Sequence, residues 1–333
     1  MISPASMISA IAGYAPSKIV CNNEIENRVN KHHEFLSPGS IERLFGVRKR
    51  RFAAEDEQVS DLAVAAANKI LVNTDPATID CLIFAAASSD LIEPATANII
   101  QHKLSLSCNA FDVKNACNSF VTALHIANAF IISKQYKKIL IVTGEKLSDA
   151  IKYTLDSKEE LANRLAAYSL GDAGAAALIE PAANGSGIFS QRFLSFGEYW
   201  KLCVIPGGGS MHPHDGSKNY FEGKTTEMRN VFLQNKGLIA QECLKETGWS
   251  LNDIDYFFMH HVSKNTFDIA AAALQISSDR FYNVIEDYGN IASASIPYAI
   301  SDAIEKGKLK KGNKLMIMGL ASGISMSVQL LIW

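Results

Sequence analysis

The sequence predicts an α/β protein in which helices cover the faces of a mainly parallel sheet. Two observations support this prediction. Short apolar runs, of which residues 80–87 are the clearest, have the continuous pattern of strands that are covered on both faces. Helical stretches alternate with these runs along the chain, and such alternation is typical of parallel sheets.

In the first half, the strand at 80–87 leads through a polar, proline-containing segment into an amphipathic helix at 95–104. A short strand at 110–113 precedes an apolar helix at 117–133, and a third strand is expected at 138–143. A glycine-containing turn at 171–174 comes before a strand at 175–179.

The second half repeats this rhythm, with expected helices at 226–247, 264–274 and 293–306 and expected strands at 254–259, 314–318 and 324–333. The two halves therefore look like variations on one layout with a seam near residues 180–190, although no literal sequence repeat is visible. From this rhythm we expect one unit over residues 1–184 and a second over residues 185–333.

The composition excludes several classes of protein. An apolar fraction of 48% with 20% charged residues excludes a disordered chain, and a formal net charge of -2 argues against a generally basic surface that coats nucleic acid. The apolar stretch at 120–132 is interrupted by His125 and Asn128 and is too short to span a bilayer. The amino terminus lacks the basic residues of a secretory signal, so we expect a soluble, cytoplasmic protein without a nucleic-acid or membrane partner.

Cys117 differs from the other five cysteines in its predicted surroundings. The six cysteines form no CxxC pair, and their scatter suggests neither a disulfide framework nor a zinc site. Cys117, however, follows a short strand and opens an apolar helix, whose dipole favours the thiolate and hence nucleophilicity. A packed, inert core cysteine is the alternative, and it is the commoner role.

Three further segments place polar groups at predicted strand ends or turns. His260 and His261 follow the strand at 254–259, and at most one of them faces a given site because strand neighbours point to opposite faces. Asn290 precedes a helix and is either a turn residue or an amide donor. Residues 319–323 are small, and they form either a tight hairpin or a loop of backbone donors for an oxyanion.

Five blocks of residues match one family in the right order: 45–51 with 59–63, 111–120, 171–177, 259–263 and 288–297. From about residue 41 to the carboxyl terminus, the sequence resembles the β-ketoacyl-acyl-carrier-protein synthase III group of the thiolase superfamily. The resemblance implies a duplicated thiolase-like α/β/α/β/α sandwich that is normally an obligate homodimer. It also implies acyl thioester substrates, with acyl-coenzyme A or an acyl carrier protein as the donor.

The resemblance also implies roles for individual residues. Cys117 would be the acyl-accepting nucleophile, His260 and Asn290 would be its partners, and His261 would occupy the position of a family glutamine. The backbone N–H groups of Cys117 and Ser322 would form the oxyanion hole.

These residues suit a decarboxylating Claisen condensation. The Cys117 thiolate would take the acyl group from a thioester. Loss of CO2 from a malonyl thioester would then give an enolate, whose oxygen His260 and Asn290 would stabilise as hydrogen-bond donors. The chemistry requires no metal, nicotinamide or nucleotide cofactor, and the sequence contains neither a P-loop nor a dinucleotide-binding pattern.

Several positions depart from the family pattern. The tryptophan and arginine that grip coenzyme A in housekeeping members are Ser40 and Leu44 here, and the arginine five residues after the histidine is Asn265. Coenzyme A would then be held differently, or a carrier protein would deliver the acyl group. Ser119 replaces the usual glycine two places after the cysteine. The leading hypothesis is therefore a synthase of a specialised rather than a housekeeping pathway.

Glu93 is the departure with the clearest chemical meaning. Housekeeping members have a bulky apolar residue here, which caps the acyl pocket of the partner subunit. The pattern Glu-Pro-Ala-Thr resembles a branch of the superfamily that condenses two long acyl groups, in which the glutamate acts as a base from the neighbouring subunit. A solvated carboxylate near a helix start is the alternative.

Other hypotheses remain open. Transfer of the acyl group to oxygen or nitrogen, or condensation without decarboxylation, would use the same cysteine. A papain-like hydrolase and a catalytically silent partner subunit are weaker rivals. His212, His214 and Asp215 could bind a metal, but a polar segment of this kind is more commonly a mobile surface loop. The basic residues of 308–314 and 48–51 could form a patch for an acidic carrier protein, although a solvated face is the default.

Overall fold

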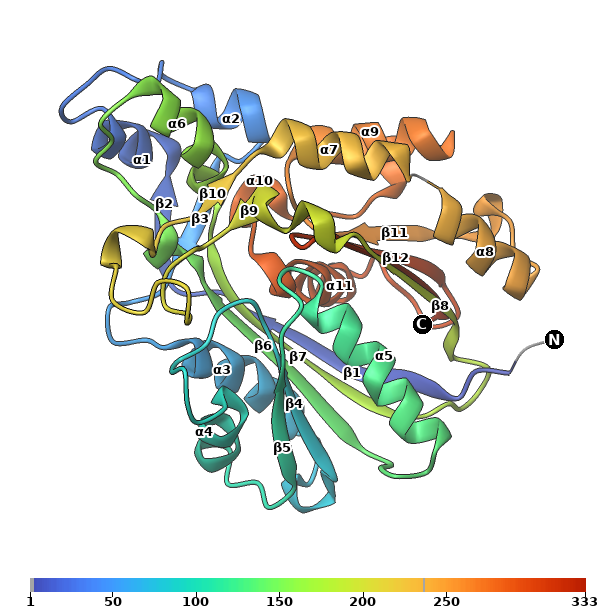
Figure 1. Ribbon diagram of the computed structural model, residues 1–333. Coiled ribbons are helices and arrows are strands. Elements are labelled where there is room, and N and C mark those ends of the chain that lie inside the picture. The colour runs from blue at the N-terminus through green and yellow to red at the C-terminus, as the bar shows by residue number, and fades with distance from the viewer. Residues whose placement is uncertain (1–2, 236) are drawn as a thin grey trace.

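The computed structural model describes residues 3–235 and 237–333 and contains two main β-sheets, one from each half of the chain (Figure 1). The first has the strand order β1-β7-β6-β4-β5, formed by β1 (Ser6–Tyr14), β4 (Cys81–Ala85), β5 (Asn109–Val113), β6 (Ile139–Lys146) and β7 (Asp172–Pro181). The second has the order β11-β12-β13-β8, formed by β8 (Gly187–Ser195), β11 (Tyr256–Met259), β12 (Lys314–Ala321) and β13 (Ser325–Ile332).

Two small sheets complete the strands: β2 (Lys18–Cys21) with β3 (Lys49–Phe52), and β9 (Cys203–Val204) with β10 (Glu222–Gly223). The helices are α1 (Asn22–Val29), α2 (Ser40–Phe45), α3 (Val59–Leu71), α4 (Thr96–Lys103), α5 (Ser119–Ile132), α6 (Lys158–Arg164), α7 (Thr225–Gln234), α8 (Leu238–Thr247), α9 (Lys264–Leu274), α10 (Ile285–Tyr288) and α11 (Ser295–Glu305).

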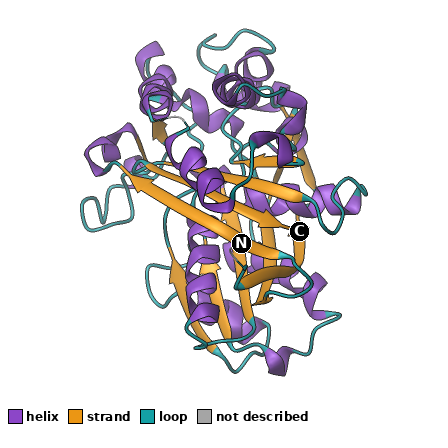
Figure 2. Ribbon diagram, turned by 90° about the vertical axis from the view of Figure 1, so that its right-hand side faces the viewer, coloured by secondary structure: helices purple, strands orange, loops and turns teal. Residues whose placement is uncertain are grey.

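The elements form five layers (Figures 1 and 2). Helices α5 and α11 lie between the two sheets and share one apolar core with both of them. Helices α3 and α4 cover the outer face of the first sheet, and α8 and α9 cover the outer face of the second. The expected α/β/α/β/α sandwich is therefore present.

Burial on both faces explains the continuous apolar runs of the inner strands. In β4, Cys81 and Ile83 face the central helices, whereas Leu82 and Phe84 face α3 and α4. A strand that alternates between two apolar layers needs apolar residues at every position. This is the pattern that identified β4 and β6 from the sequence.

The prediction of mainly parallel sheets is wrong. Strand β4 pairs in parallel with β5 and β6, and β11 pairs in parallel with β12. The ladders β1–β7, β6–β7, β12–β13 and β13–β8 are antiparallel. The direct turn from β12 to β13 allows only an antiparallel pair. Strands β1 and β8 were missed because serine, glycine and glutamine interrupt their apolar residues.

Two helix boundaries also differ from the predictions. The helix expected at 226–247 is two helices, α7 and α8, and Gly237 caps the second with a φ of 77° in the left-handed region, where glycine is favoured. The helix expected from Cys117 begins at Ser119, so Cys117 precedes the N-cap residue Asn118. None of the helices in the described ranges combines the length and apolar character needed to cross a membrane.

Candidate active site

The carboxyl ends of three strands converge on one cavity of about 500 Å³. Cys117 follows β5, His260 follows β11, and Ser322 follows β12. All three line the cavity, and Asn290 joins them from the segment before α11. The structure thus brings together four of the five residues to which the sequence assigned a role.

A strained turn presents Cys117. Ala116 has a φ of 47°, in the left-handed region that non-glycine residues enter at a cost of about 1–3 kcal/mol. Ser119 offsets this strain, because its hydroxyl donates to the Ala116 carbonyl (2.7 Å) and accepts the Asn115 N–H (2.7 Å). The serine that replaces the family's glycine therefore closes the turn that carries the cysteine.

The Cys117 thiol is neutral at rest. Burial raises its pKa well above the ordinary value, and the nearby Cys203 and Glu145 add to this effect. The expectation that the helix dipole favours the thiolate is thus corrected: Cys117 lies outside the first turn of α5, and desolvation disfavours the charged form. Ionisation of Cys117 requires an acceptor for its proton.

The two histidines point to opposite sides of β11, as strand alternation predicts. His260 lines the cavity, whereas His261 packs against Phe267 with 5.7 Å between ring centroids. Burial lowers the pKa of His260 to about 4, although the backbone of Ala292 opposes this shift. His260 Nδ1 has no hydrogen-bond partner of good geometry within the described residues. The ring is therefore neutral at pH 7 and donates a single N–H.

The Asn290 side chain is oriented by its own turn. Its Oδ1 accepts the N–H of Ala292 (3.0 Å), which leaves the amide NH2 group as a donor. Its backbone N–H donates to the Ser169 carbonyl (2.8 Å), and its carbonyl accepts the Gly171 N–H (3.0 Å). A Cβ on Gly171 would lie 2.3 Å from the Tyr288 carbonyl oxygen. Gly171, the first residue of the glycine-containing block at 171–174, is therefore needed for close packing against the Asn290 segment.

Asn118 fixes the start of β13 beside Cys117. Its Nδ2 donates to Ser325 Oγ (3.0 Å), and its Oδ1 accepts from Ser327 Oγ (2.8 Å). A Cβ on Gly319 would lie 1.8 Å from Asn118 Oδ1, so only glycine permits this approach. The predicted loop at 319–323 is shorter than expected, because β12 continues to Ala321 and the turn begins at Ser322.

Apolar side chains of α7 and α9 line one part of the cavity, and a polar network holds another part of its wall. Met228 and Phe232 of α7 face the cavity, as do Ile269 and Leu274 of α9. Apolar walls of this kind suit the hydrocarbon part of a ligand.

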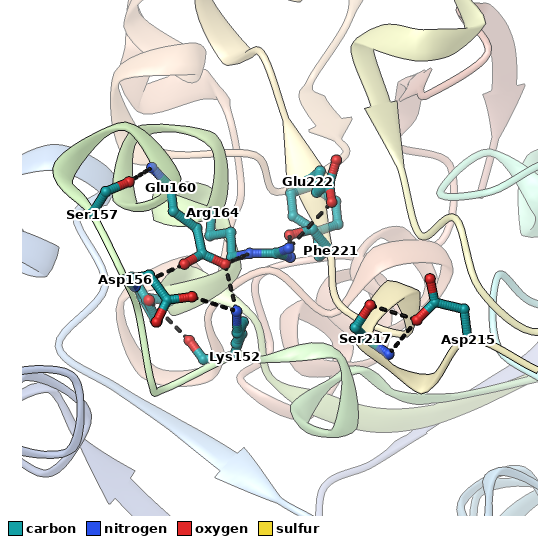
Figure 3. A network of polar contacts seen from close by, with 10 residues as sticks. Lys152, Asp156, Ser157, Glu160, Arg164, Asp215, Ser217, Phe221 and Glu222 are labelled. Atoms are coloured by element: carbon teal, nitrogen blue, oxygen red, sulfur yellow. Dashed lines mark hydrogen bonds and ion pairs between the residues drawn. The ribbon is translucent and has the colours of Figure 1, made fainter. Parts of the chain in front are cut away.

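The polar network is drawn in Figure 3. Arg164 donates to the Phe221 carbonyl (3.2 Å) and pairs with Glu222 (3.2 Å), so it anchors the segment from which Phe221 lines the cavity. Glu160 accepts from Arg164 (3.0 Å) and Lys152 (2.6 Å). Burial alone would raise the pKa of Glu160, but these hydrogen bonds and one from the Asp156 N–H lower it to about 2. The ion pairs of Glu160 therefore persist throughout the neutral range.

Glu93 does not lie in the cavity of its own chain. It is exposed in the segment between β4 and α4, beside Leu91 (52% exposed) and Ile92 (90% exposed). The structure therefore does not bring Glu93 to Cys117 within one subunit.

The other candidate sites also fall outside the cavity. Asp215 accepts from Ser217, and no three His, Cys, Asp or Glu side chains in the described ranges are grouped as a metal site requires. Arg48 and Lys49 pair with Glu286 (2.9 Å) and Asp287 (3.5 Å). Carboxylates thus offset part of the basic patch proposed from the sequence.

Two functional candidates were not identified from the sequence. Glu145 is wholly buried near the cavity, and Arg229 is the one residue with a formal charge among the described cavity-lining residues. The signal for Glu145 was a carboxylate near the end of a strand that begins with four apolar residues. Nothing in the sequence singled out Arg229, because it is one of two charged residues on an amphipathic helix.

The fold and this cavity define a class: the chain is a thiolase-fold acyltransferase. The protein superposes on OleA from Xanthomonas campestris with a TM-score of 0.89 and 25% identity, covering 100% of this chain and 99% of that one. It superposes on 3-oxoacyl-[acyl-carrier-protein] synthase III from Aquifex aeolicus with a TM-score of 0.87 and 26% identity, covering 98% and 100% of the two chains.

Sequence comparisons identify the family within this class. The family 3-Oxoacyl-[acyl-carrier-protein (ACP)] synthase III matches residues 111–197, and its C-terminal counterpart matches residues 244–333. The β-ketoacyl-[acyl-carrier-protein] synthase III of Neisseria meningitidis is 30% identical over 328 residues, covering 97% of this chain and 98% of the relative. That of Methylococcus capsulatus is 30% identical over 333 residues, covering 99% of both. The chain belongs to this family of Claisen-condensing enzymes.

The buried histidines predict a loss of stability in mild acid. The pKa values of His260 and His261 are about 4 and about 3 in the folded protein but near 6.5 in the unfolded chain. The stabilising effect of these two neutral rings on the folded protein is complete above pH 6.5 and is lost as the pH falls towards 4. Between pH 7 and pH 5, each ring is expected to lower the free energy of unfolding by about 2 kcal/mol.

Urea denaturation of the wild type and of His261→Gln at pH 7 and pH 5 measures this effect. The variant should lose less stability on acidification, by about 2 kcal/mol, and the comparison cancels the contributions of the carboxylates. His214→Gln, at an exposed loop position, is the control and should behave as the wild type. Equal acid sensitivity of His261→Gln and the wild type would contradict the prediction.

Proposed function

We propose that Cys117 is the acyl-accepting nucleophile and that His260 and Asn290 act on the second substrate. The observation that carries this proposal is the convergence of these three side chains on one cavity from three separate segments. As the sulfur attacks the acyl thioester, its proton passes by way of His260 to the departing thiol. The carbonyl oxygen of the substrate accepts hydrogen bonds from the backbone N–H groups of Cys117 and Ser322.

The condensation step follows from the neutral state of His260. A malonyl thioester loses CO2, and the enolate oxygen accepts hydrogen bonds from the imidazole N–H and from the Asn290 amide. The enolate carbon attacks the acyl carbon on Cys117, and the collapse of this adduct releases a β-ketoacyl thioester and regenerates the sulfur nucleophile. A neutral imidazole suits this role because its remaining N–H can donate a hydrogen bond to the enolate oxygen.

We infer that the donor carries an apolar acyl chain on a phosphopantetheine arm, from coenzyme A or an acyl carrier protein. The apolar side chains of α7 and α9 suit the acyl chain. Arg229 is exposed where the cavity meets solvent, and its charge suits a phosphate. Leu44 and Asn265, which replace two family arginines, also line the cavity and provide no charge. One OleA variant was crystallised with bound lauric acid and lauroyl-CoA.

We also propose a homodimer of chains that each consist of two thiolase-like halves, residues 1–184 and 185–333. Strand β5 is an edge of the first sheet, so its outer backbone groups are available to a second copy. The nearby exposed side chains of Leu91 and Ile92 are apolar, which favours burial against a partner.

A second candidate function is head-to-head condensation without decarboxylation, with Glu93 as the base. Two observations favour it. Glu93 lies in an exposed apolar segment that suits a subunit interface, and OleA has been crystallised with substitutions at a glutamate and, separately, at a cysteine. In a dimer, the partner's copy of this segment could then supply the carboxylate to the cavity.

Acylation of Cys117 is the first test. Intact-protein mass spectrometry after incubation with acyl-coenzyme A and acyl-carrier-protein donors should show the mass of one acyl group on the wild type. Cys117→Ala should gain no mass, whereas Cys21→Ser, at an exposed cysteine outside the cavity, should be acylated normally. Subsequent addition of a malonyl thioester should remove the adduct and release CO2. An adduct on Cys117→Ala would contradict the assignment.

The role of Glu93 is tested by Glu93→Gln. If Glu93 is the base, condensation of two acyl thioesters should fall by about 100-fold or more, because general-base catalysis contributes that much. Acylation of Cys117 should not change, and Glu55→Gln, at another exposed carboxylate, should have no effect. An unchanged condensation rate in Glu93→Gln would remove Glu93 from the mechanism.

The role of Arg229 is tested with donors that carry or lack the phosphate of the phosphopantetheine arm. Arg229→Ala should raise KM about 5-fold for acyl-coenzyme A and acyl-carrier protein, because an exposed ion pair contributes up to about 1 kcal/mol. KM for an acyl-pantetheine, which lacks the phosphate, should not change. Lys224→Ala, at an exposed residue outside the cavity lining, is the control. An equal effect of Arg229→Ala on all donors would exclude phosphate recognition.

A further inference from the structure

A buried carboxylate, Glu145, joins loops that carry the proposed catalytic residues. It lies near the end of β6 and is 0% exposed. Its Oε1 accepts the N–H groups of Ala87 (2.9 Å) and Ser293 (3.2 Å). Its Oε2 accepts the N–H (3.1 Å) and the hydroxyl (2.8 Å) of Ser88. Four donors from two loops thus converge on one carboxylate.

One of these donors belongs to a chain of contacts that reaches the turn of Cys117. Ser293 lies three residues after Asn290, and its hydroxyl donates to the Ala85 carbonyl (2.9 Å). The same hydroxyl accepts the N–H of Phe120 (2.9 Å), three residues after Cys117. Glu145 therefore contacts the segment of Asn290 directly and the first turn of α5 through Ser293.

The other donors fix the start of the Glu93 segment. Ala87 and Ser88 lie two and three residues after the end of β4, and the chain continues from them through Glu93 to α4. The carboxylate thus determines where this segment leaves the sheet. One side chain thus positions two segments, the one that carries Asn290 into the cavity and the one that leads to Glu93.

The charge of Glu145 lies close to Cys117 and is not neutralised by an ion pair within the described residues. Its carboxylate is among the groups that raise the pKa of Cys117. The groups of residues 86–88 and 290–293 that face the Glu145 carboxylate belong to Ala87, Ser88 and Ser293, and all of them are uncharged donors. Burial raises the pKa of Glu145 to about 7, although these hydrogen bonds favour its ionised form.

We propose that Glu145 is a positioning residue whose ionised carboxylate holds residues 86–88 and 290–293 in place, and that condensation requires this ionised form. Protonation places a hydrogen on one oxygen, which then accepts the facing N–H or O–H groups less well, so the loops lose part of their anchor. The inference rests on the proposed function, because condensation is the process it controls.

The pH dependence of condensation tests the proposal. The wild type should lose activity on the acid side with a midpoint near pH 7. Glu145→Gln should be slower by up to about 100-fold, because misplaced catalytic groups have effects of this size, and it should lack this acid limb. Ser88→Ala removes one donor to the carboxylate, so it should retain the limb but shift it to higher pH. Asp172→Asn, at a second buried carboxylate, should leave the midpoint unchanged.

A second measurement needs no substrate. Alkylation of Cys117 by iodoacetamide, followed at the peptide level, should have a lower pH midpoint in Glu145→Gln than in the wild type, because a nearby negative charge is removed. An unchanged acid limb in folded Glu145→Gln overturns the proposal. An unshifted limb in Ser88→Ala together with unchanged alkylation overturns it also. If the wild type shows no condensation with any donor while the alkylation shift is present, it is the proposed function that fails.

Discussion

The contacts at the amino-terminal end of α5 are the constraint on which the cavity depends. Asn118 binds Ser325 and Ser327 of the second sheet, and the Phe120 N–H binds Ser293, which is anchored to β4 of the first sheet. These polar groups are buried between two apolar layers, so each needs its partner. Cys117 precedes this turn, and its position relative to both sheets is therefore determined by hydrogen bonds as well as by packing.

Desolvation governs the electrostatics of the same region. Burial keeps the Cys117 thiol and the His260 ring neutral, so the resting cavity contains no ion pair between them. A neutral pair costs less to bury than two charges, and the charge that appears during the reaction is placed on substrate oxygens that preorganised donors face. The apolar lining of the cavity and the polar donors at its end thus serve one electrostatic purpose.

The sequence predicted the parts of the fold that local patterns encode. Continuous apolar runs located β4, β6 and β11, and the ordered blocks around Cys117, His260 and Asn290 located the cavity. Strand direction and strands such as β1 were not predictable in the same way, because pairing depends on partners far along the chain. The pKa of Cys117 was expected to be low because the sequence shows its position near a helix start. The sequence does not show the burial that raises this pKa. Glu145 acquires its meaning only from loops that pack against it in three dimensions.

The wall built by α7 and α9 is separated in sequence from the turns and glycines that orient the reacting groups. At position 319, for example, Asn118 leaves no room for any side chain larger than the hydrogen atom of glycine. Met228 and Ile269, in contrast, line the cavity with flexible hydrocarbon side chains. Exchanges of one aliphatic residue for another on these helices would change the depth and width available to a ligand while leaving the chemical groups in register. The architecture therefore allows related proteins to diverge in their selectivity for acyl-chain length. A few exchanges between uncharged side chains are enough, and the mechanism does not have to change.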